Sequence, residues 1–254
     1  MNFLELFKKQ NLIIAHRGDR SKKPENTLTA LESSIGKCDF MEIDVQFTKD
    51  LVPVITHDDT LGRTSNVSKI EVFKSRAPWR VSDFAEEELQ ILDFGSWFNG
   101  KYEPILSLEK ALLFAKQKHV FLNVEIKDMS HTFLDEIVVR IVLDMIQQTQ
   151  TEDLVLLSSF YHPYLILCKK LSSHIPTAAL QEYKHPDDLI DYLHALKVDA
   201  YHPDDMITKQ KTVSALREAG FFVNVFTVNK AKRRKELFDW GVNGIYTDFL
   251  ELGT

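Results

Sequence analysis

The chain has 254 residues, of which 44% are hydrophobic and 27% are charged. This balance is typical of a globular protein, and the length suits one eight-stranded α/β barrel or two small domains. The formal net charge of −6 argues against nucleic acid as a partner, although local charge decides whether a pocket binds an anion.

The amino-terminal segment and the two cysteines bear on the cellular compartment. Residues 1–10 contain the amphipathic stretch FLELFKK, without a long apolar run and cleavage site. We therefore expect neither a signal peptide nor stable membrane insertion. Cys38 and Cys168 lie far apart in the sequence and show no CxxC spacing, which favours free thiols. These features predict a cytoplasmic protein.

Short apolar runs alternate with longer amphipathic stretches along the chain. The expected strands are Leu12–Gly18, Phe40–Thr48, Val120–Lys127, Leu154–Phe160, Ile175–Gln181, Val198–His202, Phe221–Val228 and Gly244–Asp248. The expected helices include Leu108–Lys118, Phe133–Gln148, Tyr164–Leu171, Asp187–Leu196, Lys209–Ala219 and Ala231–Trp240. Alternating strands and helices predict a parallel sheet, and eight strands close into a (β/α)8 TIM barrel. A doubly wound sheet is disfavoured because its glycine-rich dinucleotide fingerprint is absent from the sequence.

The interval 52–105 interrupts this alternation. It begins with the strand-like VPVITHDD and continues through polar, aromatic-rich sequence such as APWRVSDF and FGSWFNGKYEP. Such a segment is too long for an ordinary connection between a strand and a helix. We expect a single domain over residues 1–254, with a small insertion at 52–105, after the second strand, lying over one end of the barrel.

Three His-Pro pairs follow expected strands, at His162, His185 and His202. Proline is favoured in the first turn of a helix, so each pair predicts a helix start. His202 is also a candidate for substrate contact, because it follows a strand whose end should face the mouth of the barrel.

Carboxylates occur on two of the expected strands. Glu42 and Asp44 are two residues apart and therefore point to the same side, and Glu125 lies on the next barrel strand. Three inward carboxylates repel one another unless a cation joins them, and all-oxygen ligation suits Mg²⁺ or Ca²⁺ rather than zinc. The alternative is simple ion pairing of these groups with Arg17 and Lys127.

A phosphodiester fits the same set of residues. Its negative oxygens would contact a bound cation, Arg17 and Lys127. His16 and His57, which follow separate strands, can serve as general acid and base because the ordinary histidine pKa lies near neutrality.

The order of these motifs resembles the signature of the glycerophosphodiester phosphodiesterase family. The matching blocks are HRG (16–18), PENT (24–27), ExD (42–44), HDDTLGRTSN (57–66), LDFGSWF (92–98), NVEIK (123–127), FTVN (226–229) and GVNGIYTD (241–248). They extend over nearly the whole chain.

This resemblance implies a (β/α)8 barrel with an insertion after the second strand, and hydrolysis of glycerophosphodiesters to sn-glycerol 3-phosphate and an alcohol such as choline or ethanolamine. It also implies roles for individual residues. These are metal ligation by Glu42, Asp44 and Glu125, acid–base catalysis by His16 and His57, phosphate contact by Arg17 and Lys127, and organisation of the first loop by Glu25 and Asn26.

The chain departs from the family at Phe226, where the family commonly has tryptophan. An aromatic wall is retained, but the indole N–H donor is lost, which leaves alcohol or glycerol preference open. Alternatives within the barrel enzymes are a phospholipase D-type relative that cleaves lysophospholipids and a relative that stops at a cyclic phosphate. A non-catalytic binding barrel would have damaged acid, base or metal positions, and these positions are intact.

Overall fold

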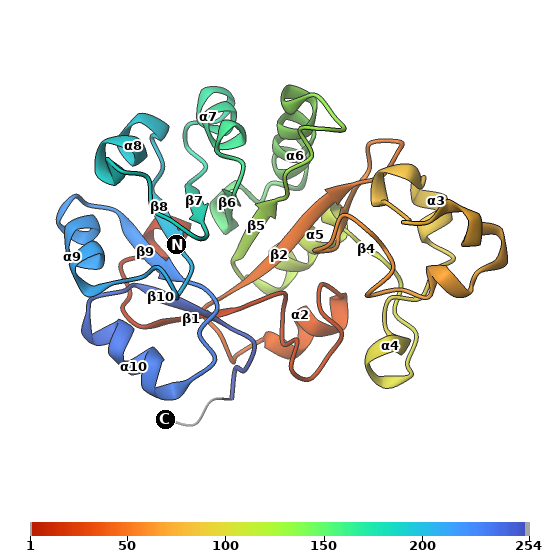
Figure 1. The fold of residues 1–254 in the computed structure, drawn as a ribbon, viewed down its shortest axis with the longest axis horizontal. Coiled ribbons are helices and arrows are strands. Elements are labelled where there is room, and N and C mark those ends of the chain that lie inside the picture. The colour runs from red at the N-terminus through yellow and green to blue at the C-terminus, as the bar shows by residue number, and fades with distance from the viewer. Residues whose placement is uncertain (1, 252–254) are drawn as a thin grey trace.

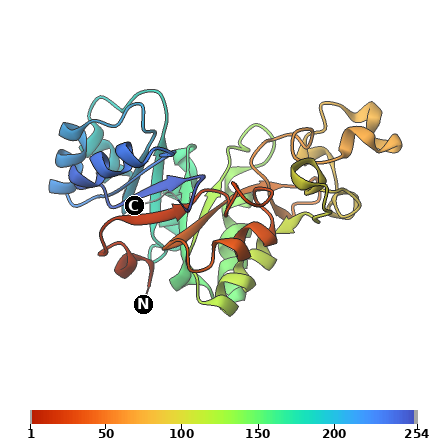
Figure 2. The same cartoon turned by 90° about the horizontal axis from the view of Figure 1, so that it is seen from below.

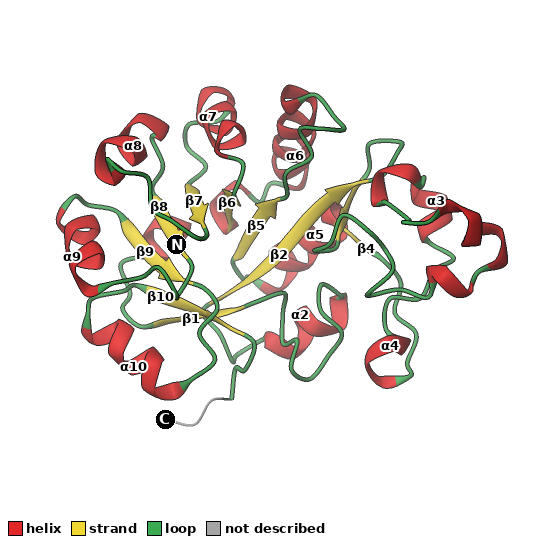
Figure 3. Cartoon of the chain, in the orientation of Figure 1, coloured by secondary structure: helices red, strands yellow, loops and turns green. Residues whose placement is uncertain are grey.

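Eight parallel strands form the centre of the molecule (Figures 1 and 3), in a computed structural model that describes residues 2–251. The order around the sheet is β1, β10, β9, β8, β7, β6, β5 and β2, and the pairing of β1 with β2 closes the ring. The predicted (β/α)8 fold is therefore confirmed. The barrel strands are β1 (Leu12–Ala15), β2 (Phe40–Phe47), β5 (Leu122–Ile126), β6 (Val155–Ser159), β7 (Thr177–Gln181), β8 (Ala200–Pro203), β9 (Phe222–Val225) and β10 (Gly244–Thr247).

Helices surround the strands and bury their apolar faces against them. In α6, for example, Val138, Val142 and Ile146 are fully buried at helical spacing. The surrounding helices are α2 (Leu28–Ser34), α5 (Leu108–Lys118), α6 (Asp135–Thr149), α7 (His162–Leu171), α8 (Leu189–Leu196), α9 (Gln210–Glu218) and α10 (Ala231–Asp239), with a short 3₁₀ helix η4 (Glu152–Leu154) before β6. The sequence pattern does not predict α2, which has seven residues and is capped at its amino terminus by Thr27.

The predicted helix starts at the His-Pro pairs are correct at only one of three positions. Pro163 lies in the first turn of α7. The other two predictions are wrong, because α8 begins at Leu189 and α9 begins at Gln210. Pro203 instead ends β8, where its carbonyl accepts a hydrogen bond from the backbone N–H of Phe226. Sheet pairing therefore overrides the local preference of proline for a helix start.

The short helix α1 (Phe3–Leu6) closes the amino-terminal end of the barrel. The ring of Phe3 packs edge to face against Phe40 at the start of β2 and against Phe121 just before β5. Phe7 contacts Phe222 at the start of β9. The amphipathic character of this segment thus comes from its role as an apolar plug. Within residues 2–251, no helix has both the length and the apolar character needed to cross a membrane.

The insertion lies between β2 and α5 and extends sideways from the barrel (Figure 2). Its strands β3 (Pro53–Ile55) and β4 (Leu106–Ser107) continue the sheet from β2 in antiparallel fashion. Between them lie η1 (Val67–Lys69), η2 (Glu71–Arg76), η3 (Val81–Asp83), α3 (Glu86–Leu89) and α4 (Ser96–Asn99). The segment has a small apolar core of its own, which includes Phe73, Phe84 and Leu92. The sequence predicts a position over one end of the barrel, but the main body of the insertion lies beside β2 (Figure 1).

Candidate active site

A cavity of about 500 Å³ lies at the carboxyl ends of the barrel strands. This is the end at which barrel enzymes place their active sites. Seven of the residues singled out in the sequence line the cavity, namely His16, Arg17, Glu42, His57, Glu125, Lys127 and Phe226.

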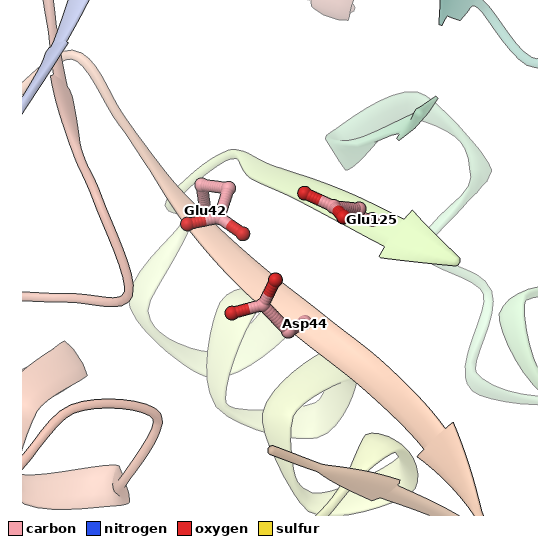
Figure 4. A group of neighbouring side chains, drawn as sticks. All are labelled: Glu42, Asp44 and Glu125. Carbon is pink, nitrogen blue, oxygen red and sulfur yellow. The ribbon is translucent and has the colours of Figure 1, made fainter. Parts of the chain in front are cut away.

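Three carboxylates cluster on one side of this cavity (Figure 4). Glu42 and Asp44 project from β2, and Glu125 projects from β5, where it is paired in register with Asp44. One oxygen from each residue can be chosen so that all three lie within 4.8 Å of one another. Each residue is buried, so the cluster is a buried set of oxygen donors.

Two cationic side chains contact the cluster but do not pair with all of its carboxylate oxygens. Lys127 Nζ lies 2.6 Å from Glu125 Oε1, and Arg17 Nε lies 3.2 Å from Asp44 Oδ2. Glu42 Oε2 accepts a hydrogen bond of 2.8 Å from the backbone N–H of Arg17, whereas its buried Oε1 has no hydrogen-bond partner among the described residues.

The pKa values of the cluster reflect this imbalance. Burial, followed by repulsion from Asp44 and Glu125, raises the pKa of Glu42 well above its ordinary value. Burial acts in the same direction on Asp44, but Lys127 and Arg17 outweigh it and lower the pKa of Asp44. Ion pairing alone therefore leaves one carboxyl unbalanced, and a divalent cation with oxygen ligands fits the donor set.

Asn26 and Glu25 lie behind these groups and hold them in place. The side-chain amide of Asn26 donates a 2.8 Å hydrogen bond to Asp44 Oδ2. Glu25 accepts hydrogen bonds from Arg17 at 3.0 Å, from Arg20 at 2.7 Å and from Arg63 at 2.7 Å. Both residues are buried, which agrees with their expected place in the first loop.

The backbone of the first loop explains the glycine of the HRG motif. Gly18 has a φ of +78°, and a Cβ atom at this position would lie 2.8 Å from Ala30 in α2. Only glycine allows this close approach of the loop to the helix. The preceding residue, Arg17, also has a positive φ of 58°, and in this conformation its N–H reaches Glu42.

Each of the two histidines is held by a carboxylate at the same ring atom. His16 Nδ1 lies 2.7 Å from Asp248 Oδ1, and His57 Nδ1 lies 2.7 Å from Asp58 Oδ1. A carboxylate accepts hydrogen bonds, so Nδ1 carries the proton and Nε2 is left for other partners. Burial lowers the pKa of both histidines, and Asp248 offsets part of this effect at His16.

His202 lies inside the barrel and is fully buried. Its Nδ1 is 2.9 Å from the hydroxyl of Tyr246, and its Nε2 is 2.9 Å from Asn224 Nδ2. Burial lowers the pKa of His202 to about 3, so the imidazole is neutral. The structure therefore places His202 behind Tyr246, whose side chain lines the cavity.

Several residues at the site receive no role from the sequence, because their partners are remote. Asp248 follows the last strand and reaches His16 across 232 positions. Asn123 and Tyr246 also line the cavity and are joined by a hydrogen bond of 2.9 Å. Phe160, Glu182 and Asp204 also line the cavity, on its other side. All of these residues lie in or just after barrel strands, which is the positional signal that could have identified them.

The fold and this site together define a phosphodiester-cleaving barrel, and comparison with known proteins gives its family. Residues 16–252 match the glycerophosphoryl diester phosphodiesterase family. A glycerophosphodiester phosphodiesterase of Bacillus altitudinis is 36% identical over 248 residues, which cover 93% of this chain and 94% of the relative.

Two solved structures have the same architecture. An Oleispira antarctica phosphodiesterase in complex with the product sn-glycerol-3-phosphate is 28% identical, with a TM-score of 0.84 over 96% of this chain and 95% of that one. A structure from Silicibacter pomeroyi, 22% identical, matches in fold with a TM-score of 0.87 over 98% of this chain and 94% of that one. The chain belongs to the glycerophosphoryl diester phosphodiesterase family, and its enzyme class is phosphoric diester hydrolase.

Proposed function

We propose that this enzyme hydrolyses glycerophosphodiesters to sn-glycerol 3-phosphate and an alcohol, with His16 and His57 as its general acid and base. One observation carries the proposal. Two histidines, each held at Nδ1 by a carboxylate, line the same cavity as a buried cluster of three carboxylates.

Glu42, Asp44 and Glu125 would hold a divalent cation, Mg²⁺ or Ca²⁺, because both ions prefer oxygen ligands. The bound ion would neutralise charge on the phosphoryl oxygens. Asn26 keeps Asp44 oriented through its 2.8 Å hydrogen bond, so the donor set is fixed before an ion arrives.

Arg17 and Lys127 bind the remaining phosphate oxygens. Both side chains line the cavity, and each is oriented by carboxylates. Burial opposes the charge on Lys127, but Glu125 and Asp44 outweigh it and raise the pKa of this amine. Lys127 is therefore cationic at neutral pH and can stabilise negative charge that develops during cleavage.

The histidines exchange protons with the substrate through Nε2. One accepts the proton of the attacking nucleophile, which is either water or a hydroxyl of the glycerol, and the other donates a proton to the oxygen of the departing alcohol. If the glycerol hydroxyl attacks, the first product is a cyclic phosphate, and water then opens it to sn-glycerol 3-phosphate with the two histidines in reversed roles. Asp248 and Asp58 keep the two rings in the required tautomer and stabilise the protonated form of each.

Two further groups define the edge of the site. Phe226 would form an aromatic wall beside the substrate, and His202 would act through Tyr246 by fixing the position of its hydroxyl.

Both cysteines are free, which supports the proposed cytoplasmic location.

The size of the cavity supports a small diester as the substrate. A volume of about 500 Å³ is within the usual range for small-molecule sites. His57 is the residue of the 52–105 insertion that lines this cavity, whereas Trp79 packs against the core of the insertion itself. An apolar groove for a lysophospholipid chain therefore receives no support from the insertion. The sn-glycerol-3-phosphate bound to the Oleispira antarctica relative favours the same substrate class.

The test is product analysis with the metal-loaded protein. Glycerophosphocholine and glycerophosphoethanolamine are incubated with and without EDTA, glycerol 3-phosphate release is coupled to its dehydrogenase, and ³¹P NMR detects any cyclic phosphate. We expect release that EDTA stops and that His16→Ala or His57→Ala lowers by about 100-fold or more. His131→Ala, which alters an exposed histidine, is the matched control. The proposal is wrong if neither diester is cleaved while the metal is bound.

A further inference from the structure

Four of the residues that line the cavity come from the strands that do not carry the carboxylate cluster. Each directly follows one of four consecutive barrel strands, β6 to β9. All four line the cavity. We call this set the acidic–aromatic wall, and it consists of Phe160, Glu182, Asp204 and Phe226.

The two aromatic rings of the wall are arranged as a corner. The ring centroids of Phe160 and Phe226 are 5.7 Å apart, and their planes meet at 88°. Lys127 Nζ lies 5.8 Å from the centroid of Phe160, so this ring already accepts an ammonium group as a neighbour. Aromatic faces attract such cations, and they do so without hydrogen bonds.

The two carboxylates of the wall have no cationic partner in the part of the chain that the structure describes. Among residues 2–251, the structure gives no ion pair to Glu182 or Asp204. Asp204 Oδ1 accepts a hydrogen bond from the backbone N–H of Met206, and Lys184, two residues after Glu182, pairs with Asp187 instead. Negative charge is therefore left available at this side of the cavity.

Independent features mark the cavity as a place that receives a ligand. Glu42 and Asn123 line the cavity, and their buried atoms Glu42 Oε1 and Asn123 Oδ1 have no hydrogen-bond partner among the described residues. Native proteins rarely leave such atoms unsatisfied unless a ligand, ion or water completes them. The carboxylates and rings of the wall therefore belong to a binding site rather than to an ordinary acidic surface.

We propose that the acidic–aromatic wall binds an ammonium group on the alcohol of the diester, and that the enzyme consequently prefers substrates with a cationic head group. This inference rests on the proposed function and extends it to the head group. The cavity would hold a zwitterion along its charge gradient. Its phosphate would lie toward Arg17 and Lys127, and its ammonium toward Glu182 and Asp204. A neutral polyol can donate hydrogen bonds to carboxylates, but it gains nothing comparable from the two aromatic faces.

The experiment compares two substrates that differ in a single charge. One is glycerophosphocholine, and the other is its 3,3-dimethylbutyl ester, in which carbon replaces the quaternary nitrogen. Neither head group can donate a hydrogen bond, so any difference reports the cation alone. We expect kcat/KM for the choline ester to exceed that of the isostere by about tenfold, which corresponds to about 1.4 kcal/mol.

Variants of the wall then assign the effect to residues. Glu182→Gln and Asp204→Asn should each lower kcat/KM for the choline ester by about threefold, through KM, and leave the isostere unchanged. Glu109→Gln on α5 removes an exposed carboxylate outside the cavity and is the matched control. Thermal unfolding of each variant shows that it is folded, and the comparison of substrates on the wild-type enzyme requires no variant.

The possible outcomes separate this inference from the proposed function. Equal rates for both esters, or variants that slow both esters alike, would overturn the head-group inference while leaving hydrolysis established. If neither ester is cleaved, the proposed function fails. Isothermal titration calorimetry of the same two esters with metal-loaded protein then tests the wall directly. Tighter binding of the choline ester would still support it, and equal binding would refute it.

Discussion

The two sides of the cavity differ in whether their charged side chains form ion pairs. On the catalytic side, built on β10, β1, β2 and β5, the side chains are joined in a continuous network. Examples are His16 with Asp248 at 2.7 Å and Lys127 with Glu125 at 2.6 Å. On the opposite side, β6 to β9 present the acidic–aromatic wall, in which Glu182 and Asp204 have no ion pair within the described residues.

This difference corresponds to two different tasks. Chemistry on a phosphate requires groups that are oriented before the substrate arrives, and a network of charged hydrogen bonds provides that order. Recognition of a head group instead requires groups whose charge is still available when the ligand binds. Changes on the catalytic side should therefore act mainly on kcat, whereas changes in the wall should act mainly on KM and on substrate preference.

The largest effect is expected from the carboxylate cluster. Asp44→Asn keeps the shape of the side chain but removes one charged ligand and disturbs the contacts with Arg17 and Asn26. We expect kcat/KM to fall by about 1000-fold or more, since several kcal/mol of charge stabilisation depend on the cluster. Metal titration by calorimetry should show weaker binding of Mg²⁺ or Ca²⁺. Full activity with unchanged metal affinity would show that the cluster is not the metal site.

A smaller effect is expected from the carboxylates that hold the histidines. Asp248→Asn should lower kcat by about 100-fold, because the imidazolium of His16 loses its negative partner. Burial lowers the pKa of His16 and Asp248 raises it, so removal of Asp248 lowers this pKa further. The limb of the pH–rate profile that reports His16 should therefore move to lower pH.

Asp58→Asn gives the matched measurement for the other histidine. Burial lowers the pKa of His57, and Asp58 raises it, so the limb that reports His57 should also move to lower pH. Profiles that stay in place for both variants would mean that neither histidine titrates in the rate-limiting step.

Carboxylates on the two sides of the cavity should also differ in how much they contribute to the free energy of unfolding. Glu25→Gln leaves Arg17, Arg20 and Arg63 without their shared carboxylate. We expect the free energy of unfolding to fall by about 2 kcal/mol, below the cost for a fully buried pair, since Arg63 is 42% exposed. Glu182→Gln removes a carboxylate that has no ion pair within residues 2–251, and it should change stability by no more than about 0.5 kcal/mol. Urea unfolding of both variants measures the difference, and equal losses would contradict the contrast between the two sides.

The barrel fold and the two clustered carboxylates of β2 follow from local patterns in the sequence. Alternating strands and helices predict the barrel, and the two-residue spacing of Glu42 and Asp44 places both carboxylates on one face of β2. The pairing of His16 with Asp248 could not be predicted in this way, because closure of the barrel brings β10 beside β1. Glu182 and Asp204 carry only a weak signal in the sequence, since acidic residues just after strands are common and the shared cavity is what relates these two.

The smallest effect is expected at Phe226, the position at which this chain departs from the family. Phe226→Trp enlarges the aromatic face in the wall, and tryptophan is the best aromatic partner for a cation. The preference for glycerophosphocholine over its uncharged isostere should rise by about twofold, whereas kcat should stay the same. Phe226→Leu is the control, because it keeps an apolar side chain without a π face and should reduce the preference. If both variants change kcat but not the preference between the two esters, Phe226 acts on the glycerol or phosphate part of the substrate. Phe226 would then not belong to the acidic–aromatic wall.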